Sequence, residues 1–165
     1  MKRVLLLVFC LSAFLFSCKK SGIAPANTIV ATVDGVTKTY VVEPIITFAP
    51  VNQLIFDGYV NHDQKADWIS IWLDASAPIT TKSYDLGSSY IDAGYSPANP
   101  SDSGRVYYNT DDKYLYDYNF TVTIKSIKGN NIQGTFSGQL LGLFRKSVIS
   151  VDGRFNINVE RRNVN

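Results

Sequence analysis

The sequence contains little cysteine, histidine or glutamate. Its cysteines are Cys10 and Cys18, its one histidine is His62, and its glutamates are Glu43 and Glu160. Two cysteines are too few for a disulfide framework or a thiolate metal site. The nucleophile-elbow pattern G-x-S-x-G and the zinc-protease pattern H-E-x-x-H are both absent. These absences remove the common signatures of a hydrolase.

The beginning of the chain has the pattern of an export signal. Lys2 and Arg3 precede an apolar run over residues 4–16. That run is shorter than the roughly 20 residues that span a bilayer, and it fits the apolar region of a secretory signal. The segment Leu15-Phe16-Ser17-Cys18 resembles the bacterial lipobox. The resemblance implies cleavage before Cys18 and attachment of lipid to its sulfur.

Export and lipidation predict where the protein is found. Residues 1–17 form the signal peptide, and Cys10 is removed with it. The mature chain has 165 − 17 = 148 residues and no disulfide. We expect it in the cell envelope, held in the outer membrane through the lipid on Cys18. The periplasmic face and the cell surface both remain open.

Net charge excludes one class of partner. The full chain has 16 Lys plus Arg against 14 Asp plus Glu. Lys2 and Arg3 leave with the signal peptide, so the mature chain has 14 of each sign. No basic stripe is visible, and nucleic-acid binding therefore has no electrostatic basis.

The mature chain divides into a tether and one domain. Residues 18–27, with the sequence CKKSGIAPAN, are polar and contain Gly and Pro. They predict a flexible tether that spans about 17–19 Å as a coil. Residues 28–165 have the length of a single domain.

Alternating apolar and polar residues predict β-strands in this domain. The pattern is clearest over residues 119–128, 132–140 and 148–159. Polar-out, apolar-in strands with short connections are typical of antiparallel sheets. The best helix candidate is a single turn over 63–66. Further strands are expected over 28–34, 37–48, 54–61, 68–74, 83–86, 90–95 and 105–110.

About eight to ten strands predict an all-β fold, and we favour an antiparallel β-sandwich. The alternative is a lipocalin-like barrel. A sandwich has a filled core between two sheets, whereas such a barrel encloses an apolar cavity. Inward-facing glycines are expected at bulges or where aromatic side chains such as Phe136 and Phe155 need room. These glycines are Gly58, Gly134, Gly138 and Gly153.

Three segments resemble a family of uncharacterised Bacteroidota lipoproteins. Residues 31–35 read ATVDG, residues 131–138 read NIQGTFSG, and residues 151–155 read VDGRF. The resemblance implies a small all-β lipoprotein domain and carries no activity with it. Surface-displayed lipoproteins of that lineage often have acidic residues after the cysteine, whereas this chain has Lys19 and Lys20.

Aromatic residues mark the candidate binding region. Eight of the ten tyrosines fall between residues 84 and 118. A tyrosine ring combines an apolar face with a polar rim, which suits stacking on sugars or peptides. The pattern also fits tyrosines that are merely half-buried on edge strands. The candidate ligand-binding residues are Tyr107, Tyr108, Tyr114, Tyr116, Tyr118, Trp68 and Trp72.

Catalytic and metal-binding candidates are weak. His62 lies beside Asp63 and near Asp67, but no nucleophile motif accompanies it. The loop acids Asp102, Asp111, Asp112 and Asp117 do not have the spacing of an EF-hand. We therefore expect no metal, no cofactor and no enzymatic activity.

These observations predict a non-catalytic module of the cell envelope that binds a glycan or protein partner. One alternative is a lipocalin-like carrier of an apolar ligand. A second alternative is an envelope hydrolase that uses His62 with Asp residues.

Overall fold

The computed structural model describes residues 22–43, 45–48, 51–63, 66–98, 108–109, 119–142 and 147–162. Within these ranges the chain forms eleven strands and one 3-10 turn, η1, and no helix there is long and apolar enough to cross a bilayer. The all-β prediction is confirmed. The elements are β1 (Thr28–Val33), β2 (Val36–Val42), β3 (Ile45–Phe48), β4 (Gln53–Tyr59), η1 (Val60–His62), β5 (Trp68–Asp74), β6 (Ser83–Asp85), β7 (Tyr90–Ser96), β8 (Tyr108–Asn109), β9 (Phe120–Lys128), β10 (Asn131–Gly142) and β11 (Val148–Arg162).

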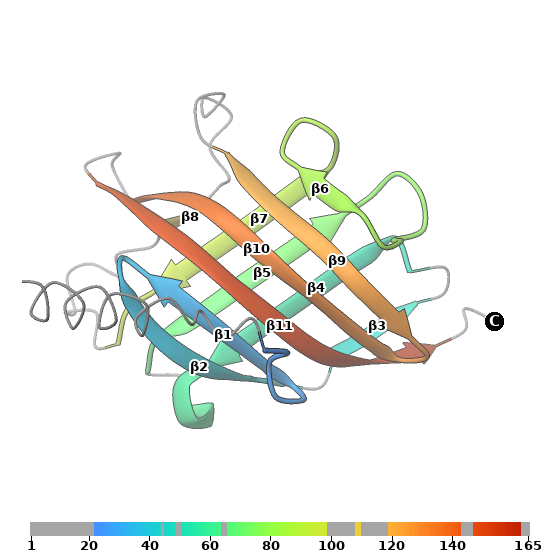
Figure 1. Ribbon diagram of the computed structural model, residues 1–165, viewed down its shortest axis with the longest axis horizontal. Helices are drawn as coiled ribbons and strands as arrows, with labels where there is room; N and C mark the ends of the chain where they lie inside the picture. Colours follow the sequence, from blue (N-terminus) through green and yellow to red (C-terminus); the bar gives the residue numbers. More distant parts are fainter. Residues whose placement is uncertain are drawn as a thin grey trace, which may run out of the picture.

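Hydrogen bonds join the strands in the order β3-β11-β1-β2-β4-β5-β7-β8-β10-β9-β6, and β10 also pairs with β11. The β11–β3 ladder is parallel, and the other ladders are antiparallel. The strands lie in two layers (Figure 1). The front layer holds β2, β1, β11, β10 and β9, and the back layer holds β4, β5 and β7.

The two layers are joined where strand pairing is short. β2 meets β4 through two residue pairs, Val41 with Tyr59 and Val42 with Gly58. On the other side, the two-residue strand β8 pairs with both β7 and β10. Pairing within a layer is longer, with eleven residue pairs between β10 and β11 and seven between β4 and β5. The fold is therefore a β-sandwich whose layers are linked along both sides, as predicted.

One predicted strand is two strands in the structure. Residues 37–48 were expected to be extended, with Pro44 marking an edge or a bend, and in the structure β2 ends at Val42 and β3 begins at Ile45. β2 pairs with β1 and β4, whereas β3 pairs with β11. The 3-10 turn η1 covers Val60–His62. The predicted turn over 63–66 lies partly outside the described residues, and the backbone N–H of Ala66 donates a hydrogen bond to the carbonyl of Asp63 at 2.9 Å.

Large side chains fill the space between the layers. Tyr40, Phe56, Phe120 and Phe155 are among the fully buried residues. The rings of Phe56 on β4 and Phe155 on β11 lie 4.9 Å apart between centroids, so they connect the two layers. Burying a side chain of this size stabilises a fold by roughly 1.5–3 kcal/mol. This filled interior is what a sandwich requires.

Glycines make room for the aromatic rings in the front layer. Gly134 is paired with Phe155, and Gly153 is paired with Phe136, across the β10–β11 ladder. A Cβ atom at Gly134 or Gly153 would overlap the ring of its partner. The predicted role of these glycines is confirmed, because an aromatic ring covers each glycine on the core side.

The last residues of the predicted tether are packed on β11. Ala24 is buried, and its carbonyl accepts a hydrogen bond from Asn156 Nδ2 at 2.8 Å. The side-chain oxygen of Asn27 accepts two hydrogen bonds from Asn158, each 3.0 Å long. The tether prediction needs correction here: the domain begins at Ala24 rather than at Thr28, because β11 supplies partners for these polar groups.

Candidate functional site

The outer face of the back layer carries both tryptophans singled out from the sequence. In β5, Trp68 and Trp72 alternate with buried residues such as Ile69 and Leu73. Successive side chains of a strand point to opposite faces, so both tryptophans point away from the core. Both are half-buried, and they share one face as predicted.

Neighbouring strands add two tyrosines to this face. Tyr59 on β4 lies directly opposite Trp68. Tyr90 on β7 meets the ring of Trp72 edge-on, with centroids 5.4 Å apart and ring planes at 75°. Tyr90 is 48% exposed. Trp68 and Trp72 are four residues apart on one strand, which separates them by roughly 13 Å. The rings therefore cover a surface longer than one sugar ring.

Three carboxylates lie beside these rings on the same face. Asp57, Asp74 and Asp92 occupy outer positions of β4, β5 and β7. Asp92 is paired with Trp72 across the β5–β7 ladder, and Asp74 accepts a hydrogen bond from Gln53 Nε2 at 3.4 Å. These three strands contain no Lys or Arg. We call this surface the aromatic face: Tyr59, Trp68, Trp72 and Tyr90 with Asp57, Asp74 and Asp92.

Hydrogen-bonding groups complete the aromatic face. Burial raises the pKa of Tyr59, and the charges of Asp57 and Glu43 raise this pKa further, so its hydroxyl remains a donor at neutral pH. Trp72 Nε1 is buried and has no acceptor in the part of the chain that the structure describes. The face thus combines flat apolar rings, the Tyr59 hydroxyl as a donor, and carboxylate acceptors.

The predicted tyrosine-rich platform lies largely outside the described residues. Tyr107, Tyr114, Tyr116 and Tyr118 are among the undescribed positions, and only the backbone of Tyr108 is described, in β8. Two further tyrosines of the rich stretch do not lie on a shared surface. Tyr84 is buried in the core, and Tyr95 packs inward, where its hydroxyl bonds to Asp67.

His62 lies beside Glu43 and not beside Asp67. Its Nδ1 lies 3.2 Å from Glu43 Oε1, and both side chains are exposed at the η1 turn. Asp67 is instead buried in a different network. It accepts hydrogen bonds from Lys38 Nζ, Tyr95 Oη and the backbone N–H of Ala98.

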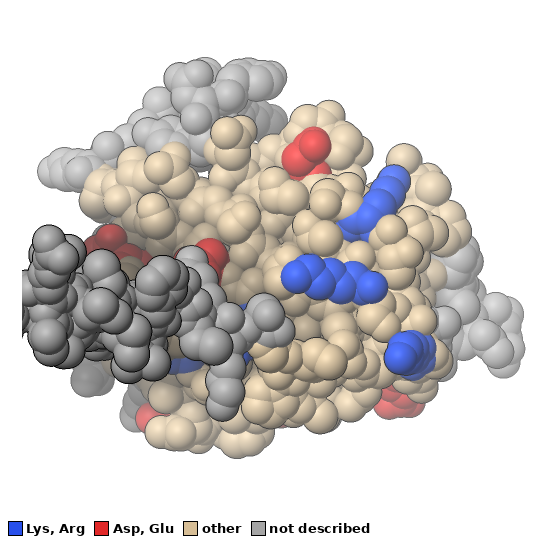
Figure 2. Space-filling view, viewed as in Figure 1, with Lys and Arg blue, Asp and Glu red and all other residues tan. Residues whose placement is uncertain are grey.

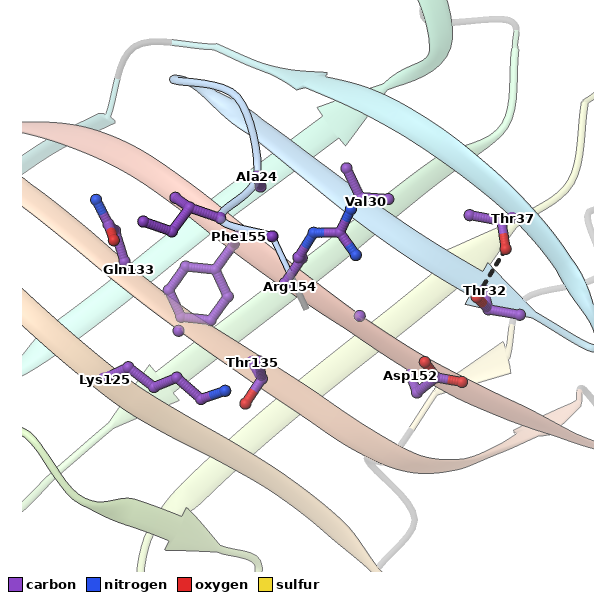
Figure 3. A pocket seen from close by; sticks show the side chains of 14 residues that line it. Ala24, Val30, Thr32, Thr37, Lys125, Gln133, Thr135, Asp152, Arg154 and Phe155 are labelled. Atoms are coloured by element: carbon purple, nitrogen blue, oxygen red, sulfur yellow. Dashed lines mark hydrogen bonds between the residues drawn. The ribbon is translucent and has the colours of Figure 1, made fainter. Parts of the chain in front are cut away.

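Apart from the aromatic face, a groove lies on the outer side of the front layer (Figure 3). This front groove has a volume of about 690 Å³. Outward side chains of β1, β10 and β11, such as Thr32, Thr135 and Arg154, line it, and Ala24 lies at its border. Thr32 and Thr37 are hydrogen-bonded at 2.9 Å across the β1–β2 ladder.

The front groove differs chemically from the aromatic face. Its outward side chains on the strands are polar or charged, apart from Val30, and the exposed Ile23 adds an apolar side chain at its border. Lys125 and Lys128 on β9 and Lys82 before β6 are exposed. Figure 2 shows Lys and Arg side chains gathered over β9 and the neighbouring chain on this side. The front of the domain therefore carries exposed cations together with carboxylates such as Asp152, whereas the three strands of the aromatic face carry carboxylates and no Lys or Arg.

The fold and these surfaces define a small all-β domain with two chemically different faces. Within the described ranges, no group of three His, Cys, Asp or Glu side chains is placed to hold a metal ion. Comparison of the chain with protein-family models, with curated proteins and with solved structures finds no match.

Proposed function

We propose that this protein is a lipid-anchored, non-catalytic module of the cell envelope that binds a neutral saccharide chain on its aromatic face. The observation that carries the proposal is the placement of two Trp and two Tyr rings on adjacent strands, with three carboxylates beside them. Aromatic rings stack on the apolar faces of sugars. Carboxylates and the Tyr59 hydroxyl match the hydroxyl groups around a sugar ring, which both donate and accept.

The charges on the aromatic face support a neutral ligand. The three strands of the aromatic face carry three Asp residues and no cation. An acidic polysaccharide would be repelled by these carboxylates. A neutral chain avoids that repulsion and still offers hydroxyl groups to the same oxygens.

The lipobox and the start of the domain support the anchor. If lipid is attached at Cys18, the five residues 19–23 connect it to the buried Ala24. The six Cα-to-Cα steps from Cys18 to Ala24 span at most about 20 Å when extended. This short connection starts beside the front groove, so it would hold the front layer toward the membrane and leave the aromatic face directed away from it.

Substitution Cys18→Ser tests the anchor. We expect the natural protein to partition into the detergent phase of a Triton X-114 extract, because two or three acyl chains give stable membrane attachment. The Cys18→Ser variant should move to the aqueous phase. Mass spectrometry of the natural protein supplies the control. An intact start at Met1 or an unmodified sulfur at Cys18 would contradict the proposal.

Substitution Trp72→Ala tests saccharide binding. Affinity electrophoresis in gels that contain a neutral glucan, mannan or xylan should show retardation of the natural protein by at least one of them. The variant should bind that polysaccharide about tenfold more weakly, because it loses one stacking ring worth roughly 1–1.5 kcal/mol. The Trp72→Phe variant keeps an aromatic ring, so its affinity for the polysaccharide should fall less.

The matched control for this test is Thr37→Ala. Thr37 is exposed on the outer side of the front layer, away from the aromatic face. Its substitution should leave retardation unchanged. Failure of all three polysaccharides to retard the natural protein would refute the proposal, and so would equal retardation of the natural protein and Trp72→Ala.

A further inference from the structure

A separate pocket opens between the two layers at the end where β1 turns into β2. It has a volume of about 280 Å³. The turn is a two-residue hairpin connection in which Asp34 and Gly35 both have positive φ, 47° and 83°. The pocket is distinct from the aromatic face, because its side chains point toward the interior. It is lined mainly by Val33, Val36, Lys38, Tyr40, Tyr95 and Ile149.

Polar groups meet on one side of this pocket. Lys38 Nζ and Tyr95 Oη both donate hydrogen bonds to Asp67, the latter at 3.0 Å. The side chain of Lys38 is 40% exposed, whereas that of Asp67 is 4% exposed. The ammonium group of Lys38 has three protons, so it has donors left for a molecule in the pocket.

Tyr40 has an unused hydrogen-bonding group in the same region. Its relative exposure is 0%, and its hydroxyl has no hydrogen-bond partner among the described residues. Burial raises the pKa of Tyr40, and the charge of Asp67 raises this pKa further, so the hydroxyl is a neutral donor close to that network. A buried hydroxyl without a partner costs about 1–3 kcal/mol. Such a group calls for a partner that the described residues do not provide.

We propose that this pocket binds a small neutral molecule with an apolar body and one hydroxyl group. The hydroxyl of the ligand accepts a hydrogen bond from Tyr40 Oη. The valine and isoleucine side chains that line the rest of the pocket contact the apolar body. Cavities of about 150 Å³ hold benzene in other proteins, so this volume suffices for one ring with a substituent.

The local charges select against an anion. Asp67 neutralises Lys38, and Asp34 adds a further negative charge among the lining residues. A ligand carboxylate would face this net negative charge, whereas a hydroxyl would not. The pocket is too small for a polysaccharide, and this inference is independent of the saccharide proposal.

The test compares phenol with toluene, which has a similar ring but no hydroxyl. The protein is the mature chain, residues 18–165, with Cys18→Ser so that no detergent is needed. NMR titrations should show phenol shifting the methyl signals of Val33, Val36 and Ile149. Phenol should bind about tenfold more tightly than toluene, and Tyr40→Phe should abolish that difference. Benzoate should bind more weakly than phenol.

Tyr40→Phe keeps the buried ring and removes only the unpartnered oxygen, so the variant should fold. A second variant, Val36→Phe, enlarges an exposed side chain at the rim and should block phenol binding. The proposal is overturned if phenol leaves these methyl signals unchanged. It is also overturned if the Tyr40→Phe variant binds phenol as tightly as the protein with Tyr40. Tighter binding of benzoate than of phenol would also overturn it.

Discussion

Substitution Gly134→Ala is expected to lower the free energy of unfolding by about 3 kcal/mol. The new Cβ atom would overlap the carbonyl oxygen of Thr123 and the ring of Phe155. Thr123 belongs to the paired strand β9, so its carbonyl cannot move without disturbing the β9–β10 ladder. The ring of Phe155 is buried and in contact with Phe56, so it also has little freedom to move. Urea denaturation monitored by tryptophan fluorescence measures the decrease in the free energy of unfolding.

Gly22→Ala is the matched control for this substitution. Gly22 has open space around its Cβ position. It also has no positive φ that would strain an alanine. Its substitution should change the free energy of unfolding by less than about 0.5 kcal/mol. Equal stability of Gly134→Ala and the natural protein would show that β10 and β11 do not pack as described.

Substitution Asp67→Asn is expected to cost about 2 kcal/mol at pH 7. Burial raises the pKa of Asp67, but hydrogen bonds from Lys38, Ala98 and Tyr95 outweigh burial and hold the pKa below its usual value. Asparagine keeps the size of the side chain and loses the charge that these donors stabilise. The cost is limited because Lys38 is partly exposed and can turn to solvent.

The difference in stability between the natural protein and Asp67→Asn should become smaller as the pH falls. Because the pKa of Asp67 is lower in the folded protein than in the unfolded chain, its carboxylate stabilises the fold above the unfolded pKa of about 3.9. This contribution is lost as the pH falls through the lowered native pKa. Thermal unfolding between pH 7 and pH 3 should therefore show the natural protein and Asp67→Asn converging in acid.

Asp152→Asn provides the control for this pH series. Asp152 is exposed on the outer side of β11. Its substitution should leave both the stability and its pH dependence almost unchanged. A constant difference between Asp67→Asn and the natural protein down to pH 3 would contradict the role of the Asp67 carboxylate.

Much of the strand structure follows from local sequence. Alternation in β5 predicts that Ile69 and Leu73 face the core while Trp68 and Trp72 face outward, and the burial of these residues confirms it. The same reasoning works for β10 and β11, where inward glycines occur among large apolar residues. Local pattern succeeds here because side-chain direction in a strand depends only on position along the chain.

The candidate sites were only partly predictable. Trp68 and Trp72 were identified from the sequence, but the tyrosines expected to join them were those between residues 107 and 118. In the described structure, Tyr59 and Tyr90 share the face of these tryptophans, because β4 and β7 are the neighbours of β5. A signal for Tyr59 was present in its outward position in β4, but no sequence pattern indicates which strands become neighbours.

The sequence by itself determined the export signal pattern, the all-β class and the face of each clear strand, since each depends on residues close together in the chain. Only the tertiary structure decided that Ala24 is packed on β11, that Asp67 is buried among donors, and that the Tyr40 hydroxyl has no partner among the residues that the structure describes. These features depend on contacts between segments separated by tens of residues. Period and composition do not encode such contacts, because hydrogen bonds between strands form equally well in many registers until side-chain packing selects one.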